Sequence, residues 1–172
     1  RSSAASDVYK RQDLCGAGVA FKLCAALEGC EDPAELLEPF GELAALGTIA
    51  DVMPLVGENR TIVKEGLATL QDTLRPGLQA LLENAGYAGR PVTAETVSYG
   101  LAPRLNAAGR MDTAAVALKL LLCENEEQAA GIAARLSEIN TSRQQAEQQI
   151  AAAALEKLSA DPARVLDRVI VV

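Results

Sequence analysis

The chain has 172 residues, enough for one hydrophobic core or for one domain with part of a second. Its net charge of −7 argues against a general basic surface for nucleic acid without excluding a local basic channel, and its 3% of aromatic residues makes base-stacking platforms unexpected. The absence of histidine excludes His-based nucleophilic catalysis and His-based zinc sites from this chain.

The cysteines and the hydropathy pattern bear on the compartment. Cys15, Cys24, Cys30 and Cys123 include no Cys-x-x-Cys pair and lie in an Ala/Leu-rich chain, where free cysteines act as buried apolar fillers in a reducing compartment. No apolar run is long enough to span a membrane. We therefore expect a cytoplasmic protein without membrane contact.

The first predicted helices come after an atypical start. Residues 1–12 match neither the composition nor the pattern of the remaining residues and resemble read-through of a sequencing adapter, so we expect them to be non-native and the native protein to extend upstream. Apolar residues cover much of the helix predicted for residues 14–29, which indicates a well-buried helix. Asp32, Pro33 and Glu35 form a good helix start, with a capping side chain, proline at the first position and glutamate at the third.

Asp51 is the anomaly of the next segment. Its carboxylate stands in an apolar run, between Ala50 and Val52, that Pro54 closes. A carboxylate in apolar surroundings is costly unless it is paired, used as a cap or bound to a metal. Two interpretations stay open: Asp51 caps a turn or faces solvent, or it is an oxygen ligand for Mg²⁺ or Mn²⁺ in a site completed outside this chain.

Helical periodicity recurs in the middle of the chain. Residues 59–71 and 76–84 carry apolar residues at helical spacing, and Gly86 is placed to cap the second of these helices. Thr93 is expected to cap a short helix. Residues 114–122 predict a largely apolar helix that should be buried.

Residues 98–111 break the local rules more than any other segment. Pro103 biases Ala102 away from the helical region, and Gly109 can adopt a positive φ where the chain turns. We therefore expect a bend whose backbone can approach a ligand closely.

The same segment carries Arg104, Asn106 and Arg110. Guanidinium forks and an amide suit the oxygens of a phosphate or the edge of a nucleotide. The alternative, a helix–helix corner with solvated arginines, explains the residues equally well.

The longest helical signal runs from residue 125 to about residue 160, with Asn125 as its cap. Apolar residues alternate along it in steps of four and three, and Arg143 lies on this narrow seam one turn after Asn140. Arg143 either snorkels to solvent or contacts a ligand. Residues 168–172 are β-branched and indicate a buried strand without a partner in this chain, so we expect the native protein to continue.

Together these segments resemble the RecJ family, the single-strand-specific 5′→3′ DNA exonucleases among the DHH phosphoesterases. The likeness is collinear over roughly residues 13–172, far more specific than any one motif. It rests on residues 14–23, 46–55 with Asn59 and Arg60 following, 100–111 and 140–144.

The resemblance implies a hydrolase of DNA repair and recombination, in which two Mn²⁺ or Mg²⁺ ions activate a water that attacks a phosphodiester of single-stranded DNA. By position, Asp51 resembles the last aspartate ligand of that centre and is the catalytic and metal-binding residue that we assign. Arg104, Asn106 and Arg110 match the segment lining the nucleotide path, so we expect phosphate or substrate contacts from them.

The resemblance also implies an α/β parent protein, of which this chain is the mostly α-helical part with one terminal strand. Residues 13–124 correspond to the C-terminal part of the DHH catalytic domain, 125–163 to the long connecting helix, and 164–172 to the start of the DHH-associated domain. The upstream aspartate and Asp-His-His motifs are absent, as is the Gly-rich motif of the second domain. We expect the chain alone to be inactive.

Three alternatives stay open. Other DHH-family phosphoesterases, such as oligoribonucleases, cyclic-dinucleotide phosphodiesterases and Mn-dependent pyrophosphatases, share the two-metal chemistry, although the segment from Pro103 to Met111 and the long following helix favour the RecJ family. A relative that has lost its catalytic ligands is the second. A non-catalytic helical scaffold, with Asp51 as a cap and solvated arginines, is the third.

Overall fold

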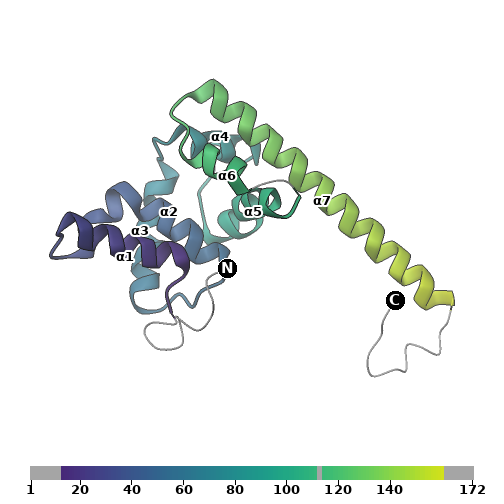
Figure 1. Ribbon diagram of the computed structural model, residues 1–172, viewed down its shortest axis with the longest axis horizontal. Helices are drawn as coiled ribbons and strands as arrows, with labels where there is room; N and C mark the ends of the chain where they lie inside the picture. Colours follow the sequence, from purple (N-terminus) through teal and green to yellow (C-terminus); the bar gives the residue numbers. More distant parts are fainter. Residues whose placement is uncertain (1–12, 112–113, 161–172) are drawn as a thin grey trace.

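The computed structural model describes residues 13–111 and 114–160, and this part of the chain is built from helices without a strand (Figure 1). The elements, in order, are α1 (Gly16–Glu28), the 3₁₀-helix η1 (Pro33–Leu36), α2 (Leu37–Ala50), α3 (Gly57–Gln71), α4 (Pro76–Asn84), the π-helix η2 (Thr96–Leu101), α5 (Ala102–Met111), α6 (Ala114–Leu121) and α7 (Glu126–Ala160). The mostly helical character predicted from the sequence is confirmed. Residues 1–12 and the strand predicted at 168–172 lie outside the described residues.

Several helix starts follow the predicted capping chemistry. The Asp32 carboxylate accepts a hydrogen bond from the Ala34 N–H at 2.9 Å, and the Glu35 carboxylate accepts one from the Asp32 N–H at 3.3 Å. Before α7, the Asn125 side chain accepts a hydrogen bond from the Gln128 N–H at 2.9 Å. Each of these side chains satisfies a backbone donor that the first helical turn leaves without a partner.

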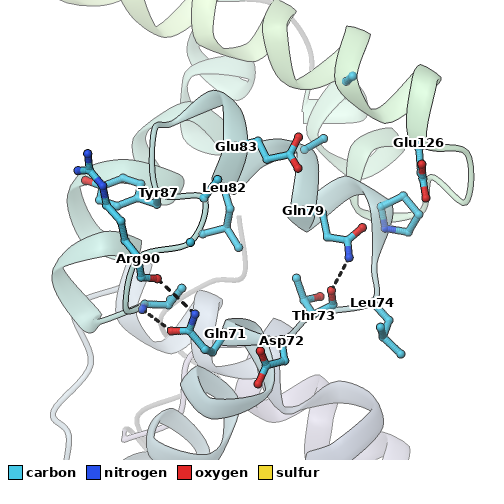
Figure 2. Close-up of a pocket in the computed structure, with 16 residues that line it drawn as sticks. Gln71, Asp72, Thr73, Leu74, Gln79, Leu82, Glu83, Tyr87, Arg90 and Glu126 are labelled. Carbon is cyan, nitrogen blue, oxygen red and sulfur yellow. Dashed lines mark hydrogen bonds between the residues drawn. The ribbon is translucent and has the colours of Figure 1, made fainter.

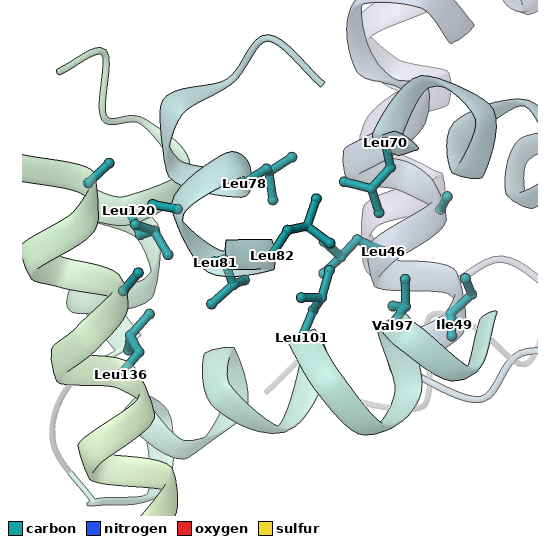
Figure 3. Close-up of a cluster of buried hydrophobic side chains, with 14 of the residues drawn as sticks. Leu46, Ile49, Leu70, Leu78, Leu81, Leu82, Val97, Leu101, Leu120 and Leu136 are labelled. Atoms are coloured by element: carbon teal, nitrogen blue, oxygen red, sulfur yellow. The ribbon is translucent and has the colours of Figure 1, made fainter. Parts of the chain in front are cut away.

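The helices pack into one body around a leucine-rich core. Helices α2 and α3 approach so closely that a Cβ atom on Gly66 would lie 2.2 Å from the Gly41 carbonyl oxygen, which explains glycine at that position. Around this pair, α4, η2, α5, α6 and the first half of α7 contribute to the main cluster (Figure 3). Its fully buried members include Leu70, Leu81 and Leu136.

Helix α7 begins in this core and then leaves it (Figure 1). Along the predicted seam, Leu136 is fully buried, whereas Ile150 is 70% exposed. The helix of residues 125–160 is confirmed, and its seam is buried only in the first half. Among the described residues, no helix is long and apolar enough to cross a membrane.

Two helices are less buried than their sequences predict. In α1, Phe21 and Ala25 pack inward, but Leu23 and Leu27 are 58% and 77% exposed. In α6, only Leu120 is buried. The expectation of well-buried helices was wrong here, because each helix packs against its neighbours along one face.

The segment around Pro103 is also not the predicted bend. Ala102 has helical angles, φ −58° and ψ −42°, and Gly109 continues α5 without a positive φ. The Ala102 N–H reaches back to the Val97 carbonyl, five residues earlier, as the wide turn of a π-helix requires. We attribute the helical Ala102 to this wide turn, which leaves room for the proline ring that a regular α-helical turn would exclude.

Candidate nucleic-acid interface

A groove of about 260 Å³ lies where the end of α2 meets η2, α5 and α7. Ala50 and Val52 line it from the end of α2, Ser98 from η2, Asn106 from α5 and Arg143 from α7. These residues are far apart in the sequence, and the helix packing brings them to one surface. The groove is therefore the candidate site of the described chain.

Asp51 lies at the rim of this groove, between two lining residues. It is the C-terminal cap residue of α2, and its own N–H donates to the Gly47 carbonyl at 3.0 Å. The side chain is exposed and has no hydrogen-bond or ion-pair partner within residues 13–111 and 114–160. The carboxylate is thus not buried among the apolar neighbours that made it anomalous in the sequence.

Arg104 is held by protein acceptors. Its Nη1 donates to the Gly100 carbonyl at 2.6 Å, and its Nε donates to the Ser137 hydroxyl at 3.0 Å. The Ser137 hydroxyl in turn donates to the Asn84 side chain. This network ties η2, α7 and α4 together and fixes the orientation of the guanidinium.

The other two predicted contact residues lie on α5. Asn106 is exposed and lines the groove. Arg110 belongs to the last turn of α5, and its side chain lies outside the described part of the structure. The structure therefore brings Asn106 to the same groove as the residues that flank Asp51.

Arg143 is the groove residue that the sequence left undecided. Its Nε and Nη2 donate to the Asn140 Oδ1 at 3.4 and 3.3 Å, and its Nη1 pairs with Glu147 one turn later. Asn140 is 5% exposed and the Arg143 side chain 21% exposed. The arginine on the apolar seam thus faces the groove, held by a buried amide.

A larger hollow, of about 560 Å³, lies between the end of α3, α4 and the loop after α4 (Figure 2). There the Gln71 amide donates to the Arg90 carbonyl at 3.2 Å and accepts from the Val92 N–H at 2.7 Å. Its charged lining residues are Asp72, Glu83, Glu126 and Arg90. An excess of carboxylates disfavours phosphate, so this hollow does not suit nucleic acid.

The described residues do not by themselves form a metal site. Among them, no group of three or more His, Cys, Asp or Glu side chains gathers at a spacing that would hold an ion. Asp51 nevertheless fits as one ligand, because its carboxylate is exposed without a protein partner and oxygen donors suit Mn²⁺ and Mg²⁺.

No family model matches the chain. It is 46% identical over 136 residues to the single-stranded-DNA-specific exonuclease RecJ of Bacillus subtilis, an alignment that covers 79% of this chain and 17% of that protein. The fold is similar to the crystal structure of Thermus thermophilus RecJ in complex with Mn²⁺, with a TM-score of 0.70 and 42% identity over 85% of this chain and 21% of that chain. It is also similar to the crystal structure of the same protein in complex with Mg²⁺, with a TM-score of 0.75 and 39% identity over 88% of this chain and 24% of that chain.

The helical body thus resembles a segment of proteins named as RecJ, among them a single-stranded-DNA-specific exonuclease. The chain spans only 17% to 27% of the length of the curated relatives it matches. It belongs to the RecJ family, as the sequence motifs indicated.

Proposed function

We propose that this chain is part of a longer single-stranded-DNA 5′→3′ exonuclease of DNA repair and recombination that works in the cytoplasm. Residues 13–124 belong to its catalytic domain, 125–163 connect that domain to a second one, and 164–172 begin the second. The observation that carries the proposal is the groove, which joins the Asp51 turn to Asn106 and Arg143. The identity to RecJ relatives supports the substrate class.

In this proposal, Asp51 supplies one ligand to a site for two Mn²⁺ or Mg²⁺ ions, and residues outside this chain supply the others. When bound, the ions would supply polarisation of the phosphodiester and an activated water. The neighbours that carry Mn²⁺ and Mg²⁺ support this choice of metals. Since one carboxylate does not hold two ions, the chain alone is inactive.

Side chains in and around the groove hold the single strand, Asn106 and Arg143 from its lining and Arg104 from outside it. Arg104 has a guanidinium already oriented by Gly100 and Ser137, so it loses little rotamer freedom on contact with phosphate. Asn106 offers both amide donors and an acceptor to a phosphate or a nucleotide. Arg110 extends the same helix, and we assign it to the same path.

The test is the substrate preference of the full-length protein with Mn²⁺. A 5′-labelled single strand is expected to release labelled mononucleotide first, while a 3′-labelled strand shortens progressively. Duplex DNA of the same sequence is the control. Preferential hydrolysis of short RNA or of a cyclic dinucleotide would move the assignment to another DHH-family phosphoesterase. No hydrolysis of any of these substrates would favour a scaffold or a relative without its catalytic ligands.

Replacing Arg143 by glutamine is expected to weaken binding of single-stranded DNA several-fold with little loss of stability. One phosphate contact on a single strand contributes about 0.7 to the slope of log K against log salt, so the magnitude of the slope should fall by about that much. Fluorescence anisotropy over a salt series measures it.

The matched control is Lys157→Gln, which removes the same charge from the exposed outer half of the same helix. This variant should keep the wild-type slope. Equal slopes for the Arg143 variant and the wild type would remove Arg143 from the DNA path.

A further inference from the structure

The turn after Asp51 has a backbone that side chains rarely adopt. Among the described residues, Val52 is the non-glycine residue with a positive φ, +55°. Its side chain is 87% exposed. A β-branched residue in this region is an outlier, and the left-handed conformation costs roughly 1–2 kcal/mol. Because Val52 is exposed, its own packing does not hold the turn, so other contacts must.

On the side of α2, backbone hydrogen bonds hold the turn. The Val52 N–H donates to the Ile49 carbonyl at 3.0 Å, and the Met53 N–H donates to the Thr48 carbonyl at 3.1 Å. These bonds close the end of the helix. They leave the outgoing chain, from Pro54 onward, to be held by something else.

The side chain of Asn59, from the first turn of α3, holds this outgoing part. Its Nδ2 donates to the Pro54 carbonyl at 3.0 Å and also to the Asp13 carbonyl. Asn59 is 2% exposed, so these bonds are shielded from water. One buried amide thus joins the chain before α1, the turn after Asp51 and helix α3.

The orientation of this amide is fixed by chemistry. The Asn59 Oδ1 is buried and has no hydrogen-bond partner within the described residues. Exchanging the amide oxygen and nitrogen would set an acceptor against two carbonyl oxygens, so only the donor can face them. When the amide makes both donor contacts, its Oδ1 is left without a hydrogen bond. A buried acceptor without a partner costs free energy and is rare in native proteins.

We propose that Asn59 is a positioning residue, whose amide holds the strained turn at Val52 and thereby sets the direction of the Asp51 carboxylate. The inference rests on the proposed function of Asp51 as a metal ligand. Without the amide, the Val52 backbone relaxes towards negative φ, and the carboxylate moves away from its place in the metal site.

The experiment measures Mn²⁺ binding to the full-length protein by calorimetry, beside its thermal unfolding and its steady-state kinetics on single-stranded DNA. Outer-shell partners of metal ligands are typically worth 10–100-fold in metal affinity, and Asn59→Ala is expected to raise the Kd for Mn²⁺ by about that factor. Activity should recover at high Mn²⁺, with the KM for DNA little changed. The Kd of Asn59→Ser, which carries one hydroxyl donor, should lie between that of the wild type and that of Asn59→Ala. The serine variant replaces the alanine variant if the alanine variant does not fold.

A second change separates positioning from a loss of stability. Glycine adopts positive φ without strain, so adding Val52→Gly to the Asn59 variant removes the strain that the amide opposes. The double variant is expected to bind Mn²⁺ more tightly than the Asn59 variant alone. Wild-type Mn²⁺ affinity in a folded Asn59 variant overturns the inference, and so does a double variant that binds no better.

Asp51→Asn distinguishes the ligand role from the positioning role. If it weakens Mn²⁺ binding while the Asn59 variants do not, only the positioning role fails. If it leaves Mn²⁺ affinity unchanged, the proposed ligand and the positioning role fail together.

Discussion

Replacing Asp51 by asparagine in the full-length protein is expected to abolish most hydrolysis of single-stranded DNA while leaving the fold slightly more stable. On the proposed mechanism, the change removes one charged ligand from the metal site. Metal ions supply several kcal/mol of transition-state stabilisation, so kcat should fall by about 10²-fold or more. Release of 5′-labelled mononucleotide with Mn²⁺ measures the loss.

The gain in stability has an electrostatic cause. Asp51 caps the C-terminal end of α2, where the helix dipole is negative and a carboxylate is unfavourable. Removing the charge should add about 0.3–1 kcal/mol, the usual range for exposed charges at helix ends. Activity and stability therefore move in opposite directions, which a variant that merely unfolds does not produce.

The chain contains a matched control for this variant. Asp72 is the C-terminal cap residue of α3 and is also exposed, but it lies outside the groove. Asp72→Asn should give a similar small gain in stability and wild-type hydrolysis. Undiminished cleavage by the Asp51 variant would remove Asp51 from the site and leave it as an exposed residue at the end of α2.

The positions of several helices could be predicted because their signals are local. Helix α4 begins at Pro76 and ends at Asn84, as predicted, and Gly86 has the positive φ of a cap, +81°. A proline fixes a helix start and a glycine tolerates the left-handed cap, so neither signal depends on the rest of the fold.

Burial and the π-helix could not be predicted in the same way. The apolar faces of α1 and α6 indicate burial, but which face finds a partner depends on the packing of the whole chain. The π-helical turn before Pro103 has no reliable sequence signal, since the same residues also predict a bend.

The groove was only partly readable from the sequence. Asp51 and Asn106 stood out by their chemistry, but the arrangement of α2, α5 and α7 was needed to bring Asn106, Arg143 and the two neighbours of Asp51 to one groove. Asn59 entered the sequence analysis only as one of the residues that carry the family resemblance, and its positioning role could not be predicted, because its contacts are to backbone carbonyls whose positions the sequence does not reveal. The positive φ of Val52 runs against its β-branched side chain, so propensity alone would not have suggested it.

The largest expected loss of stability comes from a buried ion pair that the sequence did not single out. Glu42 on α2 is 4% exposed, and its Oε1 lies 2.5 Å from the Nε of Arg75, the residue that precedes α4. Arg75 also donates from Nη2 to the Pro39 carbonyl at 2.8 Å. The other carboxylate oxygen, Oε2, is buried without a hydrogen-bond partner in the described chain, so Arg75 is the principal compensation for this charge.

Arg75→Ala is expected to lower the free energy of unfolding by about 3 kcal/mol, the low end of the usual range for breaking a buried pair, because the arginine is one-third exposed. For a chain of this size that corresponds to a fall in Tm of roughly 10 °C. The loss arises from a buried carboxylate left without its counter-ion. Thermal unfolding of the 172-residue chain, followed by circular dichroism, measures it.

Two further variants test the cause. Lys64→Ala breaks an exposed pair with Glu65, in which the side chains are 77% and 44% exposed, and should change stability by less than about 1 kcal/mol. Replacing Glu42 and Arg75 together by methionine should recover most of the loss, since an apolar pair of similar volume needs no counter-ion. A double variant as unstable as Arg75→Ala would show that the arginine acts through its bond to the Pro39 carbonyl, holding α2 against the start of α4, and that the buried charge contributes little.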